Sequence, residues 1–214
     1  MIIKKTKMNC ELNDIGQEFL VYAYFGITKE DSDEIIIQKC VKKAYLDVCR
    51  TLRFKEQYKE SKENKKEKDE KIKVICRDLT KKIYNNGNLI VDPNELFKFF
   101  LEKDNETIKD FGLKKYLKED FHFGQAQKWV NMTLKYLYLL DFVNGEKMLE
   151  LHIPIDNYII EALREDGIKV PEKHWSKWNK KEYDKLVNNI LPEHYLLWEH
   201  DNWIRIAEKK KRSK

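Results

Sequence analysis

The sequence contains little glycine and proline, with seven and four residues respectively among 214. So few chain-breaking residues argue against a β-sandwich, a collagen or a glycine-rich nucleotide-binding fold, and they leave room for long helices. No apolar run approaches the roughly 18 residues that a membrane-spanning helix needs, so we expect no contact with a membrane. These scarcities favour an all-α protein.

The four cysteines, Cys10, Cys40, Cys49 and Cys76, are scattered along the first half of the chain. None forms a C-x-x-C pair, and no histidine pair stands near them at metal-binding spacing. This pattern argues against zinc ribbons and cysteine-ligated iron–sulfur clusters, and we expect neither a metal nor another cofactor. Because the sequence shows no signal peptide, we expect reduced thiols and a cytoplasmic protein.

Charge is abundant: 37% of residues are charged, and 42 basic against 37 acidic residues give a net charge of +5 at pH 7. This mild excess permits nucleic-acid binding without being diagnostic of it. Residues 55–73 are nearly all charged, with both signs mixed, and are predicted to form a solvated helix end or a flexible connection. The hydrophobic content of 42% suffices for a core, so we expect residues 1–214 to form a single helical domain.

Apolar residues recur at intervals of three and four along most of the chain, which is the signature of amphipathic helices. Two helix starts are marked by capping residues: Asp92-Pro93, and Asn179-x-x-Glu182, which is a capping box. Pro192 predicts the start of the last helix. The remaining periodic segments predict helices over 15–25, 36–52, 72–83, 108–117, 125–141 and from 156 to about 167. No strand pattern competes with them.

Small residues and a lysine near the middle of the chain suggest chemistry. Gly124 and Ala126 stand at the mouth of a helix, with Lys128 one turn further in. Small residues there allow a tight turn, expected at 122–125, and let backbone N–H groups approach an anion such as a phosphate. Asp156 precedes an apolar helix, where its carboxylate would cap the first backbone N–H groups.

These residues resemble two segments of the helix-hairpin-helix DNA glycosylases. Gly124, Ala126 and Lys128 match their G-x-G-x-K hairpin, with alanine for the second glycine, and Ile153-Pro154-Ile155-Asp156 matches their [FVI]-P-[VIL]-D segment. The long separation of lysine and aspartate, together with Gln127-Lys128 and Lys135-Tyr136, is most similar to the archaeal 8-oxoguanine DNA glycosylase branch, whose members also lack an iron–sulfur cluster. The resemblance covers roughly residues 110–205.

The resemblance implies two helical lobes around a cleft that receives an oxidised or modified purine extruded from DNA. Lys128 would attack the sugar C1′, expel the base and form a Schiff base that permits β-elimination, while Asp156 would accept a proton and stabilise positive charge on the sugar. Gly124, Gln125 and Ala126 would hold a DNA phosphate. The implied partner is DNA with a modified base, in base-excision repair or in antiviral defence.

Tryptophans of the C-terminal third are candidates for the wall of a base pocket. Trp175 and Trp178 interrupt the helical periodicity, so we expect one of them to line the cleft and stack on the base. Trp198 and Trp203 accompany apolar residues of the last predicted helix, and we expect both to be core residues.

Each candidate also has a simpler interpretation. Lys128 taken alone is typical of a solvated helix lysine, Asp156 of a helix N-cap and Gly124 of a turn glycine. The alternative function is a non-catalytic helical module that binds a nucleotide, nucleic acid or a protein and keeps the hairpin only as structure. A cleft that brings Lys128 within reach of Asp156 favours the enzyme, whereas a hairpin buried against another lobe favours the module.

Overall fold

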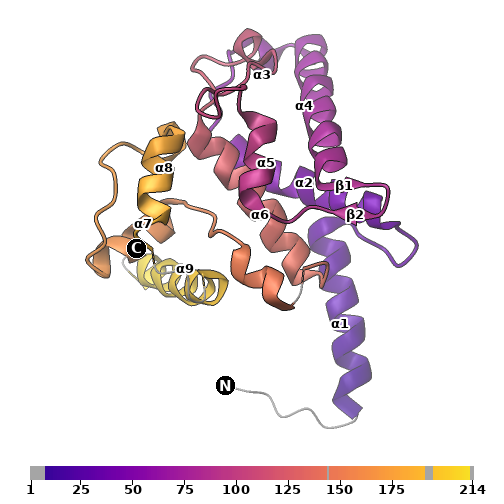
Figure 1. Cartoon of the computed structure of the whole chain (residues 1–214). Coiled ribbons are helices and arrows are strands. Elements are labelled where there is room, and N and C mark those ends of the chain that lie inside the picture. Colours follow the sequence, from indigo (N-terminus) through magenta and orange to yellow (C-terminus); the bar gives the residue numbers. More distant parts are fainter. Residues whose placement is uncertain (1–7, 144, 191–194, 213–214) are drawn as a thin grey trace.

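The computed structural model describes residues 8–143, 145–190 and 195–212, which are mainly helical (Figure 1). The all-α class predicted from the sequence is confirmed, and no helix in these ranges is long and apolar enough to cross a membrane. The elements are α1 (Met8–Phe25), α2 (Asp33–Cys49), α3 (Gln57–Glu60), α4 (Lys62–Ile83), β1 (Tyr84–Asn85), β2 (Asn88–Leu89), α5 (Pro93–Phe100), η1 (Leu113–Lys115), α6 (Phe123–Leu139), η2 (Gly145–Glu150), α7 (Asn157–Glu165), η3 (Trp175–Lys177), α8 (Lys180–Val187) and α9 (Tyr195–Arg212).

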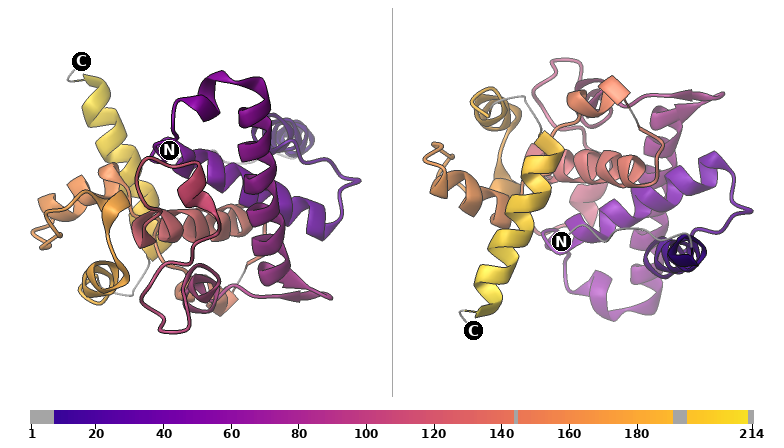
Figure 2. Two further views of the ribbon diagram at one scale, coloured as in Figure 1. Left: turned by 90° about the horizontal axis from the view of Figure 1, so that it is seen from above. Right: turned by 90° about the horizontal axis from the view of Figure 1, so that it is seen from below.

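Helix α6 is the centre of the molecule, and the other elements are arranged around it (Figures 1 and 2). Helices α2, α5 and α8 and the 3-10 turn η3 all pack directly against it, α4 packs on α2 and α5, and α9 packs on α7. Thirteen of the 17 residues of α6 are buried. A helix that is enclosed nearly all round belongs to the core, so side chains on α6 are held firmly by their surroundings.

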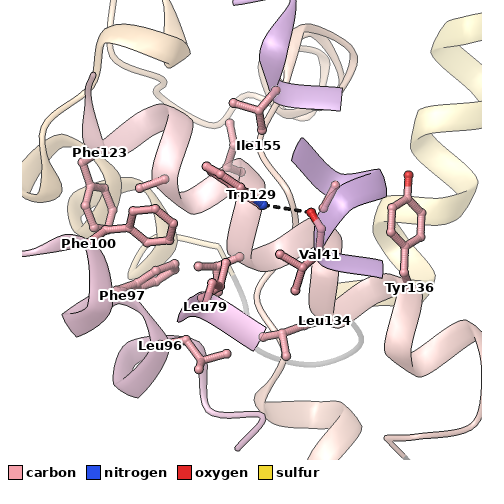
Figure 3. Close-up of a cluster of buried hydrophobic side chains, with 14 of the residues drawn as sticks. Val41, Leu79, Leu96, Phe97, Phe100, Phe123, Trp129, Leu134, Tyr136 and Ile155 are labelled. Carbon is pink, nitrogen blue, oxygen red and sulfur yellow. Dashed lines mark hydrogen bonds between the residues drawn. The ribbon is translucent and has the colours of Figure 1, made fainter. Parts of the chain in front are cut away.

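The core gathers around Trp129 of α6, which is fully buried (Figure 3). Its indole Nε1 donates a hydrogen bond of 3.0 Å to the carbonyl oxygen of Val41, which ties α6 to α2. The rings of Phe97 and Phe100 from α5 and Phe123 from α6 complete an aromatic cluster at edge-to-face and tilted angles. Such ring pairs add to the hydrophobic gain of burial.

Both helix starts predicted from capping residues are confirmed. Asp92 caps α5, with its Oδ1 accepting the Asn94 N–H at 2.8 Å and Pro93 in the first turn. Asn179 and Glu182 form the reciprocal capping box of α8, at 2.9 and 2.8 Å. The predicted start of the last helix at Pro192 lies outside the described residues.

The charged segment 55–73 is mostly helical. It comprises α3 and the first half of α4, which begins after its N-cap Ser61. Surface ion pairs hold it against the loop 114–118: Glu67 contacts Lys115 and accepts the Tyr116 hydroxyl, and Glu56 pairs with Lys118 at 2.5 Å. The segment is therefore the solvated helix end of the prediction.

Two segments differ from expectation. The helix ending at 83 leads into a two-stranded antiparallel hairpin, β1–β2, because Asn86 and Gly87 both adopt positive φ and so form a tight hairpin turn. The helix predicted over 108–117 is wrong, since only the short turn η1 forms there. Gly112 has a φ of 74° and donates its N–H to Asp110, a turn that interrupts helical backbone before η1.

Candidate functional site

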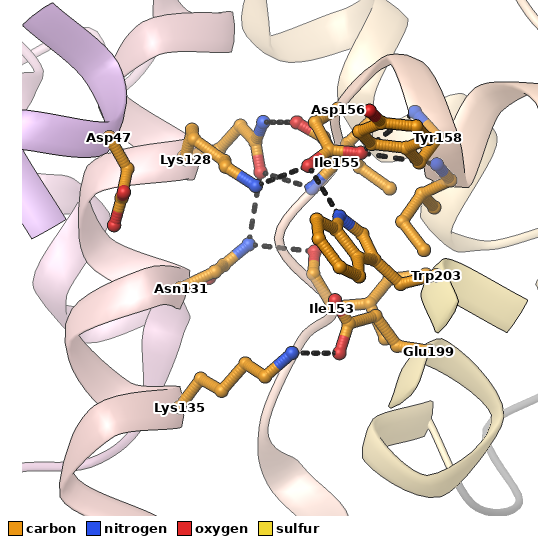
Figure 4. Close-up of polar contacts among 12 residues, drawn as sticks. Asp47, Lys128, Asn131, Lys135, Ile153, Ile155, Asp156, Tyr158, Glu199 and Trp203 are labelled. Atoms are coloured by element: carbon orange, nitrogen blue, oxygen red, sulfur yellow. Dashed lines mark hydrogen bonds and ion pairs between the residues drawn. The ribbon is translucent and has the colours of Figure 1, made fainter. Parts of the chain in front are cut away.

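Lys128 and Asp156 meet as an ion pair, although they come from separate elements (Figure 4). Lys128 lies in α6, and Asp156 is the N-cap of α7, where its Oδ1 accepts the N–H groups of Tyr158 and Ile159 at 3.0 and 3.1 Å. The other carboxylate oxygen, Oδ2, accepts Lys128 Nζ at 2.8 Å and the indole Nε1 of Trp203 at 3.3 Å. Capping and ion pairing thus use different oxygens of one carboxylate.

The pair is largely shielded from solvent, with 8% of the Lys128 side chain and 17% of the Asp156 side chain exposed. Burial by itself would raise the pKa of the Asp156 carboxyl. The ammonium of Lys128, the capped N–H groups and the Trp203 indole outweigh that effect and hold this pKa below its usual value. Asp156 is therefore ionised at neutral pH.

The ion pair lies in the wall of an open cavity of about 540 Å³, within the usual size range of small-molecule pockets. Helix α6 contributes one side of the cavity, α1 and α2 a second, and α7 and α9 a third. Aromatic rings line much of it, and charged groups of both signs stand between them. The lining aromatic residues are Tyr24, Tyr136, Tyr158, Trp175 and Trp203.

Two further polar groups of the cavity were not predicted. Lys135 lies seven residues after Lys128 on the same side of α6 and pairs with Glu199 of α9. Glu199 is only 1% exposed. The hydroxyl of Tyr136 donates to Asp47 of α2 at 2.5 Å. The sequence singled out Lys135 and Tyr136 only as part of the resemblance, without a role in the site, and it gave no indication of their partners Glu199 and Asp47.

The positions of the tryptophans agree with the prediction only in part. Trp175 borders the cavity with a nearly buried ring, whereas Trp178 is fully buried and donates its Nε1 to the Lys173 carbonyl at 2.7 Å. Trp203 was expected in the core, and this is wrong: it is 37% exposed and lines the cavity against Tyr158, with ring centroids 5.0 Å apart. Trp203 lies at the border of the buried face of α9, whereas Ile206 and Glu199 point into the protein.

The residues of the expected hairpin begin α6 itself. Residues 118–122 are not helical, and α6 runs without a break from Phe123 through Gly124, so the tight turn expected at 122–125 is wrong and no pair of α-helices flanks it. All three hairpin amides already have carbonyl acceptors within the protein: Gly124 N–H donates to Trp178 at 2.9 Å, and those of Gln125 and Ala126 to His122 at 3.1 and 3.2 Å. In this conformation they have no free hydrogen for a DNA phosphate, and the predicted phosphate contact does not fit.

Gly124 instead allows a close approach between α6 and η3. A Cβ at this position would stand 1.8 Å from the carbonyl oxygen of Trp175, far inside van der Waals contact. Glycine is required here because only it leaves room for a neighbouring backbone. The glycine of the motif therefore fixes where the Trp175 segment lies beside the cavity.

The described residues offer no metal site. Among them, no group of three or more histidine, cysteine or acidic side chains is placed to hold a metal ion. Cys40, Cys49 and Cys76 are free thiols, and burial raises the pKa of Cys40 and of Cys76 to about 12. These two thiols stay protonated at neutral pH.

Comparison with models of protein families, with curated proteins and with solved structures finds no match for this chain. The chemistry of the cavity must therefore be inferred from its own residues. Its defining features are a shielded amine–carboxylate pair, aromatic walls and an opening to solvent.

Proposed function

We propose that the protein is a DNA glycosylase with lyase activity, which removes an oxidised or modified purine through a Schiff base on Lys128. The observation that carries this proposal is the 2.8 Å contact between Lys128 Nζ and Asp156 Oδ2 in the wall of an open, aromatic-lined cavity. The resemblance of the Lys128 and Asp156 segments to the helix-hairpin-helix glycosylases supports it. The reaction would serve base-excision repair or antiviral defence.

The reaction begins with an amine that must lose its proton. Asp156 accepts this proton, because it is the ionised group in direct contact with Lys128 Nζ. When DNA covers the cavity and displaces water, the charged pair loses solvation, which favours the neutral amine and neutral acid. The substrate itself thus promotes the proton transfer that makes Lys128 a nucleophile.

The neutral amine then attacks the sugar C1′. The bond from C1′ to the base nitrogen breaks, the bonding electrons leave with the base, and the base takes up a proton. Opening of the sugar ring gives the Schiff base, and removal of a C2′ proton expels the 3′-phosphate by β-elimination. Asp156 gives the proton that it took from Lys128 to the departing base and so regains its negative charge. This charge stabilises the positive charge that develops on the sugar before the new bond is complete.

The cavity suits a flipped-out base. Its volume of about 540 Å³ accommodates a purine, and the rings of Tyr158 and Trp203 offer faces beside the ion pair. Stacking of a base on an aromatic side chain contributes about 1–3 kcal/mol. Lys135, Glu199 and Asp47 supply polar groups for hydrogen bonds to the edge of the base.

A second candidate is a non-catalytic module that binds a nucleotide, nucleic acid or a protein. One observation favours it: the hairpin amides are all paired internally, and Gly124 is packed against η3. In that case Lys128 and Asp156 would be a structural ion pair at the N-terminus of α7, and the cavity would hold its ligand without breaking a bond.

Borohydride trapping separates the two candidates. DNA duplexes that carry 8-oxoguanine or an abasic site are incubated with the protein and sodium borohydride, which reduces a Schiff base to a stable covalent adduct. We expect an adduct with the wild type and none with Lys128→Gln. Lys135→Gln is the matched control on the abasic duplex: it removes an amine from the same helix face and cavity, and it should still give the adduct because this substrate has no base for Lys135 to contact.

The possible results discriminate clearly. Trapping by Lys128→Gln at the wild-type level would assign the nucleophile to another amine. No adduct with the wild type on either substrate, combined with measurable DNA or nucleotide binding, would favour the module. Thermal melting of each variant shows whether a lost adduct reflects lost chemistry or lost folding.

A further inference from the structure

Gln127, the residue before Lys128, holds the backbone just before Asp156. Its carboxamide makes two hydrogen bonds to one residue: Nε2 donates to the Ile155 carbonyl oxygen at 3.0 Å, and Oε1 accepts the Ile155 N–H at 3.2 Å. The Gln127 side chain is completely buried. A carboxamide that satisfies both backbone groups of an extended residue fixes that residue in position and register.

A second carboxamide reinforces this arrangement one turn further along α6. Asn131 Nδ2 lies 3.1 Å from the Ile153 carbonyl oxygen and 3.1 Å from Gln127 Oε1 (Figure 4). It also donates toward the Tyr183 hydroxyl at 3.0 Å. The segment leading to Asp156 is therefore attached to α6 at two alternate residues, as a strand would be attached to a neighbour.

Two consecutive residues of α6 thus hold the backbone that precedes Asp156 and the carboxylate of Asp156 itself. Gln127 fixes the backbone at Ile155, and Lys128 contacts the carboxylate of Asp156. The next backbone N–H groups bind Asp156 Oδ1 as a cap, so this carboxylate has little freedom once Ile155 is held. A misplacement of about 1 Å in a reacting pair can cost a hundredfold in rate.

We propose that Gln127 is a positioning residue, whose carboxamide sets the contact between Lys128 and Asp156 by holding Ile155. It touches neither the substrate nor the reacting atoms, and it acts only through the backbone before Asp156. The effect on base release rests on the proposed glycosylase function, whereas the effect on the ion pair does not.

The first test measures the ion pair directly in the free protein. Lysines are labelled by brief reductive methylation, and the extent at each lysine is read by peptide mass spectrometry. Gln127→Met keeps a similar side-chain volume but removes both hydrogen bonds. We expect Lys128 labelling to rise about tenfold, because an amine released from its carboxylate partner and from the shielded wall of the cavity becomes more accessible to the reagent.

Two controls make this result specific. Lys135 in the same protein should label as in the wild type, because its partner Glu199 lies on α9. Thr133→Val removes a fully buried hydroxyl of α6 that donates to the Trp129 carbonyl oxygen at 2.9 Å and does not contact the site. It should leave Lys128 labelling unchanged. If Gln127→Met lowers the melting temperature and leaves Lys128 labelling unchanged, Gln127 serves packing alone and the proposal is overturned.

A measurement on the wild type covers the case in which Gln127→Met does not fold. Ile155 lies outside any helix or strand, yet its N–H is bound to Gln127, so its hydrogen exchange should be as slow as that of helical amides nearby. Fast exchange at Ile155 would overturn the proposal.

The DNA reaction provides the final arm. Gln127→Met should slow single-turnover base release about tenfold to a hundredfold and leave the dissociation constant for DNA unchanged. Unaltered base release by a variant that folds would overturn the positioning role. If labelling of Lys128 rises as expected but wild-type protein never forms a trapped adduct, the positioning of the pair stands and the glycosylase function falls.

Discussion

Substituting Gly124 by alanine tests how tightly α6 packs against η3. The added Cβ would lie 1.8 Å from the Trp175 carbonyl oxygen, where ordinary contacts begin at 3.4 Å, so the two backbones must separate by about 1.6 Å. That movement also breaks the bond of 2.9 Å from the Gly124 N–H to the Trp178 carbonyl. The atom that must give is backbone, which cannot rotate away as a side chain would.

The expected cost combines two effects. A lost backbone hydrogen bond in a buried position contributes about 1 kcal/mol, and forcing an extra carbon into a packed core costs about 1–3 kcal/mol. The free energy of unfolding should therefore fall by about 2–4 kcal/mol. For a chain of this size, each kcal/mol lowers the melting temperature by about 2–4 °C, so a decrease of about 4–16 °C is expected.

Urea denaturation and thermal melting followed by circular dichroism measure this loss. Gly16→Ala is the matched control, because a Cβ at Gly16 meets nothing within 4 Å and the residue lies inside α1. There, alanine should leave stability unchanged or raise it by up to about 1 kcal/mol. Gly124→Ala with wild-type stability would refute the close approach and return Gly124 to the role of a simple turn residue.

Three further outcomes are expected. Asp156→Asn should retain the helix cap but slow base release by about 10²–10⁴-fold in single-turnover assays, with DNA affinity little changed. Trp203→Ala should weaken binding of lesion-containing DNA by about ten- to a hundredfold and leave undamaged duplex binding as it is, measured by fluorescence anisotropy. Burial lowers the pKa of His152 below 6.5, so the unfolded state binds its proton more readily and the free energy of unfolding should decrease as pH falls from 7 to 5. Burial likewise lowers the pKa of His122, so His152→Asn should reduce this slope in urea titrations but not remove it; an unchanged slope would contradict the assignment to His152.

Local signals in the sequence were sufficient for much of the fold. The capping residues Asp92 and Asn179 determine where their helices begin, because a cap needs only its own neighbours. The helix expected over 108–117 was wrong because the spacing of apolar residues was given more weight than the turn residues. Asp110 and Gly112 form a turn there that prevents a continuous helix.

The candidate site was predictable only as far as its motifs reached. Lys128 and Asp156 could be paired because both lie in segments that resemble one family. The prediction for Trp203 was wrong because periodicity shows that a helix is amphipathic but does not show how wide its buried face is. The contacts of Glu199 and Asp47 join residues far apart in the chain, and nothing in the sequence near either residue indicates its partner.

The burial of α6 has a consequence for how the cavity fluctuates. Amides of a helix enclosed on nearly all sides exchange with solvent only when the whole domain unfolds, so α6 should be among the slowest segments in hydrogen-exchange experiments. Among the described side chains of α9 only Leu196, Glu199 and Ile206 are buried, and ion pairs of Glu165 with Arg205 and Lys209 join it to α7 at the surface, so it should open far more often. Lys128 thus stays in place while the wall that carries Trp203 moves, so the time for which a ligand remains bound should be governed by α9.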